Sequence, residues 1–226
     1  MKFLRERFRK CLSGGKIPVW LKVIFTLYAA VFVGVLAPAG PLNLLWFCNA
    51  AVLVILLALW LESSLLLSMQ LLAILWPHLF WQLDYFTQMT LGIKIFKFCG
   101  LTPAEYMFDP GFASLRRCLS MQHAWMLYFL LWMVWRLGYD RRALGAQTLY
   151  AWVILLLSYA LVRDIHGPAG NVNSIYGLSA SEPQTRMAPW LWLVVLMVFM
   201  PLCWYGPLHF VFRRKFCPPK DRCSTV

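Results

Sequence analysis

Charged residues are scarce in this chain, and acidic residues are the scarcest. Only 13% of the 226 residues are charged, with 9 Asp and Glu against 21 Lys and Arg, whereas 61% are hydrophobic and 16% are aromatic. A soluble fold of this length has too little interior to hide so much apolar surface. The composition therefore excludes an ordinary soluble globular protein and predicts an integral membrane protein.

The chain also lacks the spacings of metal and disulfide motifs. Its 7 Cys are scattered without a CxxC pair, and no HExxH or HxxxH pattern occurs, so neither a zinc knuckle nor a disulfide framework is predicted. The net charge of +12 is carried by short basic runs beside apolar stretches, which is typical of membrane orientation rather than of nucleic-acid binding. We expect membrane lipid as the partner, without nucleic acid, metal or cofactor; the sequence leaves the oligomeric state open.

Long apolar stretches make up most of the chain. Each has about the 20 residues that a helix needs to cross a bilayer. They are residues 19–36, 41–60, 65–83, 119–137, 144–162 and 189–212. We predict an all-α integral membrane helical bundle of about six transmembrane helices.

The bundle, residues 19–212, is predicted to be a single transmembrane domain. It lies between a basic amphipathic N-terminal segment, residues 1–18, and a basic tail, residues 213–226. With six spans, most Lys and Arg residues fall on the side that holds both ends of the chain, and the positive-inside rule then places that side in the cytoplasm. We predict a multi-pass protein of the cell membrane with both termini cytoplasmic.

The longest stretch between predicted spans, residues 84–117, is too apolar for a flexible linker. We expect an ordered outer loop that folds back over the bundle. Within it, residues 91–98 have the sequence LGIKIFKF, which is typical of an interfacial or re-entrant helix.

Polar side chains that can take part in chemistry gather at the outer ends of the predicted spans. They are Asn43, Cys48, Asn49, His78, Gln82, Asp84, Ser120, His123, Asn171 and Asn173. Polar groups are costly in hydrocarbon, so they normally face a bundle interior, a wet cavity or each other. The sequence predicts a polar chamber in the outer half of the bilayer.

Several functions are compatible with such a chamber. In the first, Cys48 is a nucleophile and His123 or His78 is its base, the logic of a Cys/His/Asn acyl-transfer site. Polar support or substrate binding would come from Asn49, His78, Asp84, Gln82, Asn171 and Asn173. In the second, a metal ion is bound by imidazole and carboxylate groups from among His78, His123, His166, Asp84 and Asp164. In the third, the chamber binds a lipid headgroup or small solute without catalysis, and a purely structural membrane subunit is a further alternative.

Three short motifs resemble the YwaF-type multi-spanning family. The first is Pro41-Leu42 followed by Leu45-Trp46-Phe47-Cys48-Asn49, the second is Leu119-Ser120-Met121-Gln122-His123, and the third is Asn171-Val172-Asn173-Ser174-Ile175-Tyr176. The resemblance implies a membrane-embedded Cys and His, here Cys48 and His123, associated with acyl transfer onto ether phospholipids in the eukaryotic branch. The chain departs from that pattern at Trp46, and at Gln122 and Ala124 beside His123, where the family has further histidines.

Overall fold

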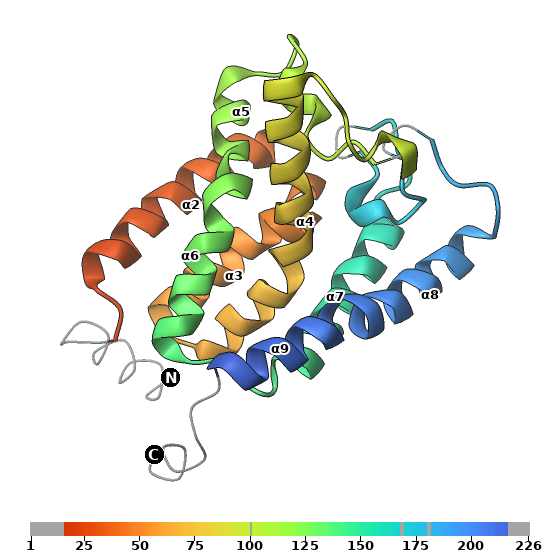
Figure 1. Ribbon diagram of the computed structural model, residues 1–226. Coiled ribbons are helices and arrows are strands. Elements are labelled where there is room, and N and C mark those ends of the chain that lie inside the picture. Colours follow the sequence, from red (N-terminus) through yellow and green to blue (C-terminus); the bar gives the residue numbers. More distant parts are fainter. Residues whose placement is uncertain (1–15, 100, 168–169, 180–181, 217–226) are drawn as a thin grey trace.

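A computed structural model describes residues 16–99, 101–167, 170–179 and 182–216. Most of the predicted N-terminal amphipathic segment and the end of the basic tail, residues 1–15 and 217–226, lie outside the described residues. The described chain contains helices and no β-strand, so the predicted all-α helical bundle is confirmed (Figure 1).

Helices occupy all six predicted spans. The first three are α2 (Val19–Ala39), the short 3₁₀ helix η1 (Pro41–Leu45) with α3 (Phe47–Leu61), and α4 (Ser64–Leu91). The fourth and fifth are α5 (Ser114–Ser120) with α6 (Gln122–Leu137), and α7 (Ala143–Leu161). The sixth consists of α8 (Pro189–Phe199), the π-helical turn η5 (Met200–Tyr205) and α9 (Gly206–Phe216). The loops carry the 3₁₀ turns η2 (Lys97–Cys99), η3 (Glu105–Phe108) and η4 (Val172–Ser174).

Four of these segments are long and apolar enough to cross a membrane. They are α2, α4, α7 and the continuous stretch from α8 to α9. The other two, α3 and α6, have 15 and 16 residues. Large apolar side chains such as Leu27, Leu149 and Trp190 are exposed on the outside of the helices, as expected of a protein whose solvent is lipid. The four long segments are compatible with a membrane protein by length and composition; membrane insertion, the six-span count and the cytoplasmic termini stay predictions.

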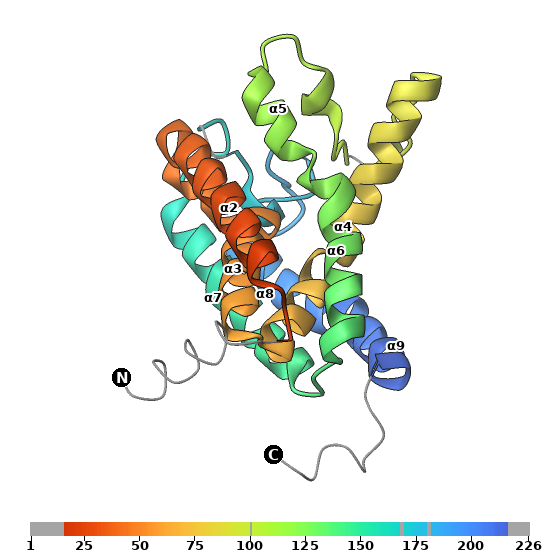
Figure 2. The same cartoon turned by 90° about the vertical axis from the view of Figure 1, so that its left-hand side faces the viewer.

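The central helix of the bundle is α4. It packs against α3, α6 and α7. In its most apolar stretch of 18 residues 61% of the residues are buried, against 28% in the corresponding stretch of each of the other three long segments. Figures 1 and 2 show α4 and α6 side by side, with α2 crossing on one face and α8 to α9 running obliquely on another.

The two ends of the bundle differ in how the helices are joined. One end, the turn end, holds the tight turns after α3 and after α6, and residue Phe216 of α9 lies there because its carbonyl accepts from Tyr139 N at 3.1 Å. The opposite end, the loop end, holds the described residues of two loops, 92–99 with 101–113, and 162–167 with 170–179 and 182–188. The predicted polar residues are at the loop end.

The prediction of an interfacial or re-entrant helix over residues 91–98 is wrong. Helix α4 runs eight residues beyond its predicted end at Leu83 and stops at Leu91. Gly92 adopts a left-handed φ of 68°, and its N–H and that of Ile93 bond back to Gln88 and Thr87, which is the Schellman pattern of a helix end. Only the single turn η2 follows, so the LGIKIFKF segment does not form a helix of its own.

Candidate functional site

A proline places the first histidine of the site. Pro77 lies inside α4 and has no N–H, so the turn around it is loosened. In the next position His78 is fully buried, and its Nδ1 lies 2.9 Å from the carbonyl oxygen of Ile74. Because a carbonyl oxygen only accepts, the Nδ1 of His78 carries the proton.

A broken helix places the second histidine. An unbroken helix would pair the Ser120 carbonyl with Ala124 N, but at the junction of α5 and α6 Ala124 N bonds to Met121 O instead, at 2.9 Å. The Ser120 carbonyl is thereby free to accept from the Nδ1 of His123, at 2.8 Å. His123 therefore also carries its proton on Nδ1 when neutral.

The two imidazoles form a pair. Their ring centroids are 4.8 Å apart with 34° between the planes. In both rings the lone pair is on Nε2, the nitrogen that a general base uses. The Nε2 of His78 is buried and makes no hydrogen bond among the described residues. A buried polar atom without a partner costs folding free energy, and a catalytic role is one reason for a protein to keep it.

Aromatic and amide groups fix the orientation of the pair. Trp81 stacks on His123 with centroids 5.1 Å apart, and Tyr85 stacks on Trp81 with centroids 4.8 Å apart. The Gln82 amide donates to the His123 carbonyl at 2.7 Å, and its oxygen accepts from the Tyr128 hydroxyl at 2.8 Å. Gln82 thus ties α4 to α6 with both ends of its side chain satisfied.

The predicted nucleophile lies in the first turn of α3. The thiol of Cys48 is partly buried and points its Sγ toward Asn49 Oδ1, 3.6 Å away. Asn49 donates to the Asn43 carbonyl at 2.8 Å and accepts from Gln122 Nε2 at 3.1 Å. The hydroxyl of Tyr28 donates to Gln122 Oε1 at 3.2 Å. A continuous polar chain therefore connects α2, α3 and α6, and Gln122 directly precedes His123.

Tyr106, from the loop turn η3, contacts Trp81 and Ser120 and is near the Cys48 thiol. Its hydroxyl accepts from Trp81 Nε1 at 3.0 Å. Burial raises the pKa of Tyr106 to about 12, a hydrogen bond with Ser120 opposes the rise, and the nearby Cys48 adds to it. We call these connected residues the polar cluster: Tyr28, Cys48, Asn49, His78, Trp81, Gln82, Tyr106, Gln122 and His123.

A buried carboxylate holds the loop over the polar cluster. Asp84 is fully buried, and its Oδ2 accepts from Ala104 N at 3.0 Å and from Gln88 Nε2 at 2.8 Å. Ala104 and Met107 pack with Trp81 in a small core of their own. The expectation that the long loop folds back over the bundle is confirmed, and Asp84 fastens this loop.

The two loop asparagines have structural contacts. Asn173 accepts from Phe47 N at 2.9 Å and donates to Leu45 O at 2.8 Å, so it caps the beginning of α3. Asn171 donates to Gly177 O and Ser179 O, both at 2.9 Å. Neither asparagine has a hydrogen bond to Cys48, His78 or His123 in the described chain.

The structure brings together only part of the predicted chamber. His123 contacts both His78 and Gln82. Cys48 and Asn49 are connected to this group through Gln122, which bonds Asn49 and directly precedes His123. Tyr106, which bonds Trp81, is a second connection. No hydrogen bond links Cys48 to either histidine in the described part of the chain. In the same part, no three His, Cys, Asp or Glu side chains are grouped closely enough to hold a metal ion, and the metal-binding alternative has no support.

Four members of the polar cluster were not predicted as site residues. Trp81 follows His78 by three positions and Gln122 precedes His123, so both had a positional signal in the sequence. Tyr28 and Tyr106 come from α2 and from the long loop, and no local pattern marks them.

Comparison with known proteins gives no match: no protein-family model matches the chain, and no curated protein or solved structure matches it at a significant level.

Proposed function

We propose that this membrane protein acts on membrane lipid by transferring or hydrolysing an acyl group at the polar cluster. Cys48 would be the nucleophile and the His78–His123 pair would supply the base. The observation that carries the proposal is the pair of buried imidazoles with Nδ1 protonated and the lone pair on Nε2, in the same polar cluster as a thiol. Buried imidazoles in such positions are functional by default.

The chemistry would run in two steps. An imidazole Nε2 takes the thiol proton of Cys48, and the thiolate attacks the carbonyl carbon of a lipid ester. The ester C–O bond breaks, the lysolipid alcohol leaves with the proton from the imidazolium, and a thioester remains on Cys48. A second alcohol, or water, then gives its proton to Nε2, attacks the thioester and releases the thiol. An alcohol gives acyl transfer and water gives hydrolysis.

Tyr106 is a neutral donor near the thiol that would serve a developing oxyanion. The Asn49 oxygen accepts from the thiol and its amide N–H donates to the Asn43 carbonyl, so Asn49 would orient the Cys48 thiol rather than stabilise negative charge. Cys48 is also in the first turn of α3, where the helix dipole favours negative charge. Tyr106 and the helix terminus would together support a tetrahedral intermediate, which is the role of an oxyanion hole.

The first experiment is a comparison of membrane lipids in cells that express the protein and its variants. His78→Asn and His123→Asn each keep an N–H donor near the position of Nδ1 and remove Nε2. We expect them, like Cys48→Ala, to abolish the change in acyl composition that the wild type produces. His209→Asn is the matched control, because His209 is on α9 at the turn end, bonded to Tyr139 at 2.8 Å. A lipid profile that is unchanged by the wild type, or changed equally by Cys48→Ala, rejects the proposal.

A non-catalytic binding site for lipid or a small solute is the second candidate. It is favoured by the contact of Sγ with Asn49 rather than with an imidazole. It predicts that lipid co-purifies equally with wild type and with Cys48→Ala, while cellular lipids stay unchanged.

A further inference from the structure

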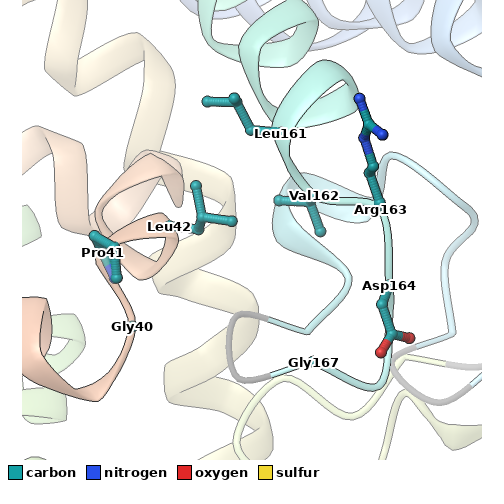
Figure 3. Close-up of a pocket in the computed structure, with 8 residues that line it drawn as sticks. All are labelled: Gly40, Pro41, Leu42, Leu161, Val162, Arg163, Asp164 and Gly167. Atoms are coloured by element: carbon teal, nitrogen blue, oxygen red, sulfur yellow. The ribbon is translucent and has the colours of Figure 1, made fainter.

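A hollow at the loop end lies apart from the polar cluster. It has a volume of about 380 Å³ and is lined by Gly40, Pro41, Leu42, Leu161, Val162, Arg163, Asp164 and Gly167. Figure 3 shows Leu42 extending from η1 toward Leu161 and Val162 at the end of α7. Its walls are the loop-end termini of two candidate membrane spans, α2 and α7, which is the depth at which lipid headgroups lie.

Two opposite charges stand next to each other on one wall of the hollow. Arg163 and Asp164 are both exposed, and Figure 3 shows the guanidinium alongside α7 and the carboxylate toward the loop at Gly167. In a phospholipid with a zwitterionic headgroup the phosphate is nearer the hydrocarbon and the ammonium is farther out. The positions of the two side chains match this order, with the cation deeper and the anion farther out.

An apolar stripe leads from the hollow along α7. Leu149, Val153, Leu157 and Leu161 are spaced four apart, so they share one face of the helix, and all four are exposed. The stripe is about 18 Å long at a rise of about 1.5 Å per residue, close to the roughly 15 Å depth of one leaflet's hydrocarbon. An acyl chain that starts at the hollow therefore has an apolar face to lie against for its full length.

From this geometry we propose that the hollow and the α7 stripe bind one phospholipid with a zwitterionic phosphate–ammonium headgroup. Arg163 binds the phosphate, Asp164 binds the ammonium, and the acyl chain follows Leu161, Leu157 and Val153. This site needs no chemistry at Cys48, so it is independent of the proposed acyl transfer.

Native mass spectrometry of the purified full chain tests the site with two added lipids. One is a phosphatidylethanolamine and the other is a phosphatidylglycerol with the same acyl chains, which has the phosphate but no ammonium. All variants are made in the Cys48→Ala background, where turnover is impossible. We expect Arg163→Gln to weaken both lipids about fivefold, the effect of one basic residue at a membrane surface. Asp164→Asn should weaken the phosphatidylethanolamine alone and remove the preference for it.

Steric blocking is the second arm. Leu161→Trp enlarges an exposed side chain at the hollow, so it can fill the site without repacking the core, and it should weaken phosphatidylethanolamine binding. The matched control is Leu27→Trp, an exposed leucine of α2, and Arg186→Gln is the charge control from the same loop region. Equal binding of the two lipids by the parent, an unchanged preference in Asp164→Asn, or full binding by Leu161→Trp would each overturn the proposal.

Discussion

An ion pair at the turn end gives the sharpest stability prediction. Lys22 Nζ lies 2.8 Å from Glu62 Oε1, and the side chains are 0% and 16% exposed. The same carboxylate accepts from Ile17 N at 3.2 Å and from Lys16 N at 3.0 Å. Glu62 therefore joins the beginning of α2 to the turn between α3 and α4.

Replacing Glu62 with Gln keeps an acceptor for the backbone but leaves the Lys22 ammonium buried without a countercharge. Breaking a buried pair on one side costs about 3 kcal/mol. At about 3 °C per kcal/mol for a chain of this size, the midpoint of thermal unfolding should fall by about 9 °C. The assay is thermal unfolding of the detergent-solubilised protein followed by Trp fluorescence.

The double variant separates the buried charge from lost packing. Lys22→Met with Glu62→Gln removes the uncompensated charge, and apolar replacement of a buried ion pair is often neutral. We expect the double variant to recover most of the loss, and the exposed Glu182→Gln to leave the midpoint unchanged. A midpoint of Glu62→Gln equal to wild type, or a double variant as unstable as the single one, would refute the reasoning.

The same carboxylate predicts a dependence on pH. Burial acts to raise the pKa of Glu62, but the hydrogen bonds from Lys22, Ile17 and Lys16 outweigh it and hold the pKa below its ordinary 4.5. A lowered pKa means that the stabilisation is present above pH 4.5 and is lost as the pH falls through the folded-state pKa. The midpoint of wild type should therefore fall more steeply than that of Glu62→Gln when the pH is lowered from about 5 to about 3.

Three further changes test the loop end. Asn173→Ala should cost about 2 kcal/mol, because it removes a helix cap and puts alanine at a left-handed φ of 54°; chemical unfolding measures this. Asp84→Asn should release the loop at Ala104, seen as faster amide hydrogen exchange of residues 101–113 with α4 unchanged. Gly92→Ala should cost about 1 kcal/mol because of its left-handed φ of 68°, and an unchanged unfolding midpoint would contradict that estimate.

The sequence predicted the bundle because apolar run length alone determines where a helix can cross a bilayer. It could not predict where those runs are interrupted. The breaks at Trp46 and Met121 are single extended or turned residues inside predicted spans. The break at Met121 frees the Ser120 carbonyl that orients His123. The break at Trp46 is held by the Asn173 cap, which comes from more than a hundred residues along the chain.

The contacts of the polar cluster could be predicted only in part, for a similar reason. His78, Gln82 and His123 met because four-residue spacing and span direction place them at one depth. Asp84, Asn171 and Asn173 have the same depth and polarity, yet their partners are backbone groups that no local pattern reveals: loop groups for Asp84 and Asn171, and the beginning of α3 for Asn173. The depth of each polar residue along its predicted span therefore located the polar layer of the bundle. Only the fold distinguishes the side chains that contact one another from those that hold loops in place.

The central claim is that the histidine pair activates Cys48. The most direct measurement is the rate at which a thiol-alkylating probe labels Cys48 in membranes near neutral pH, quantified by mass spectrometry of the Cys48 peptide. Labelling of the exposed Cys118 in the same sample serves as the internal reference. We predict that His123→Asn or His78→Asn slows labelling of Cys48 by about a hundredfold, the usual contribution of a general base, while His209→Asn has no effect. Labelling of Cys48 that is equally fast in all of these variants would contradict the account.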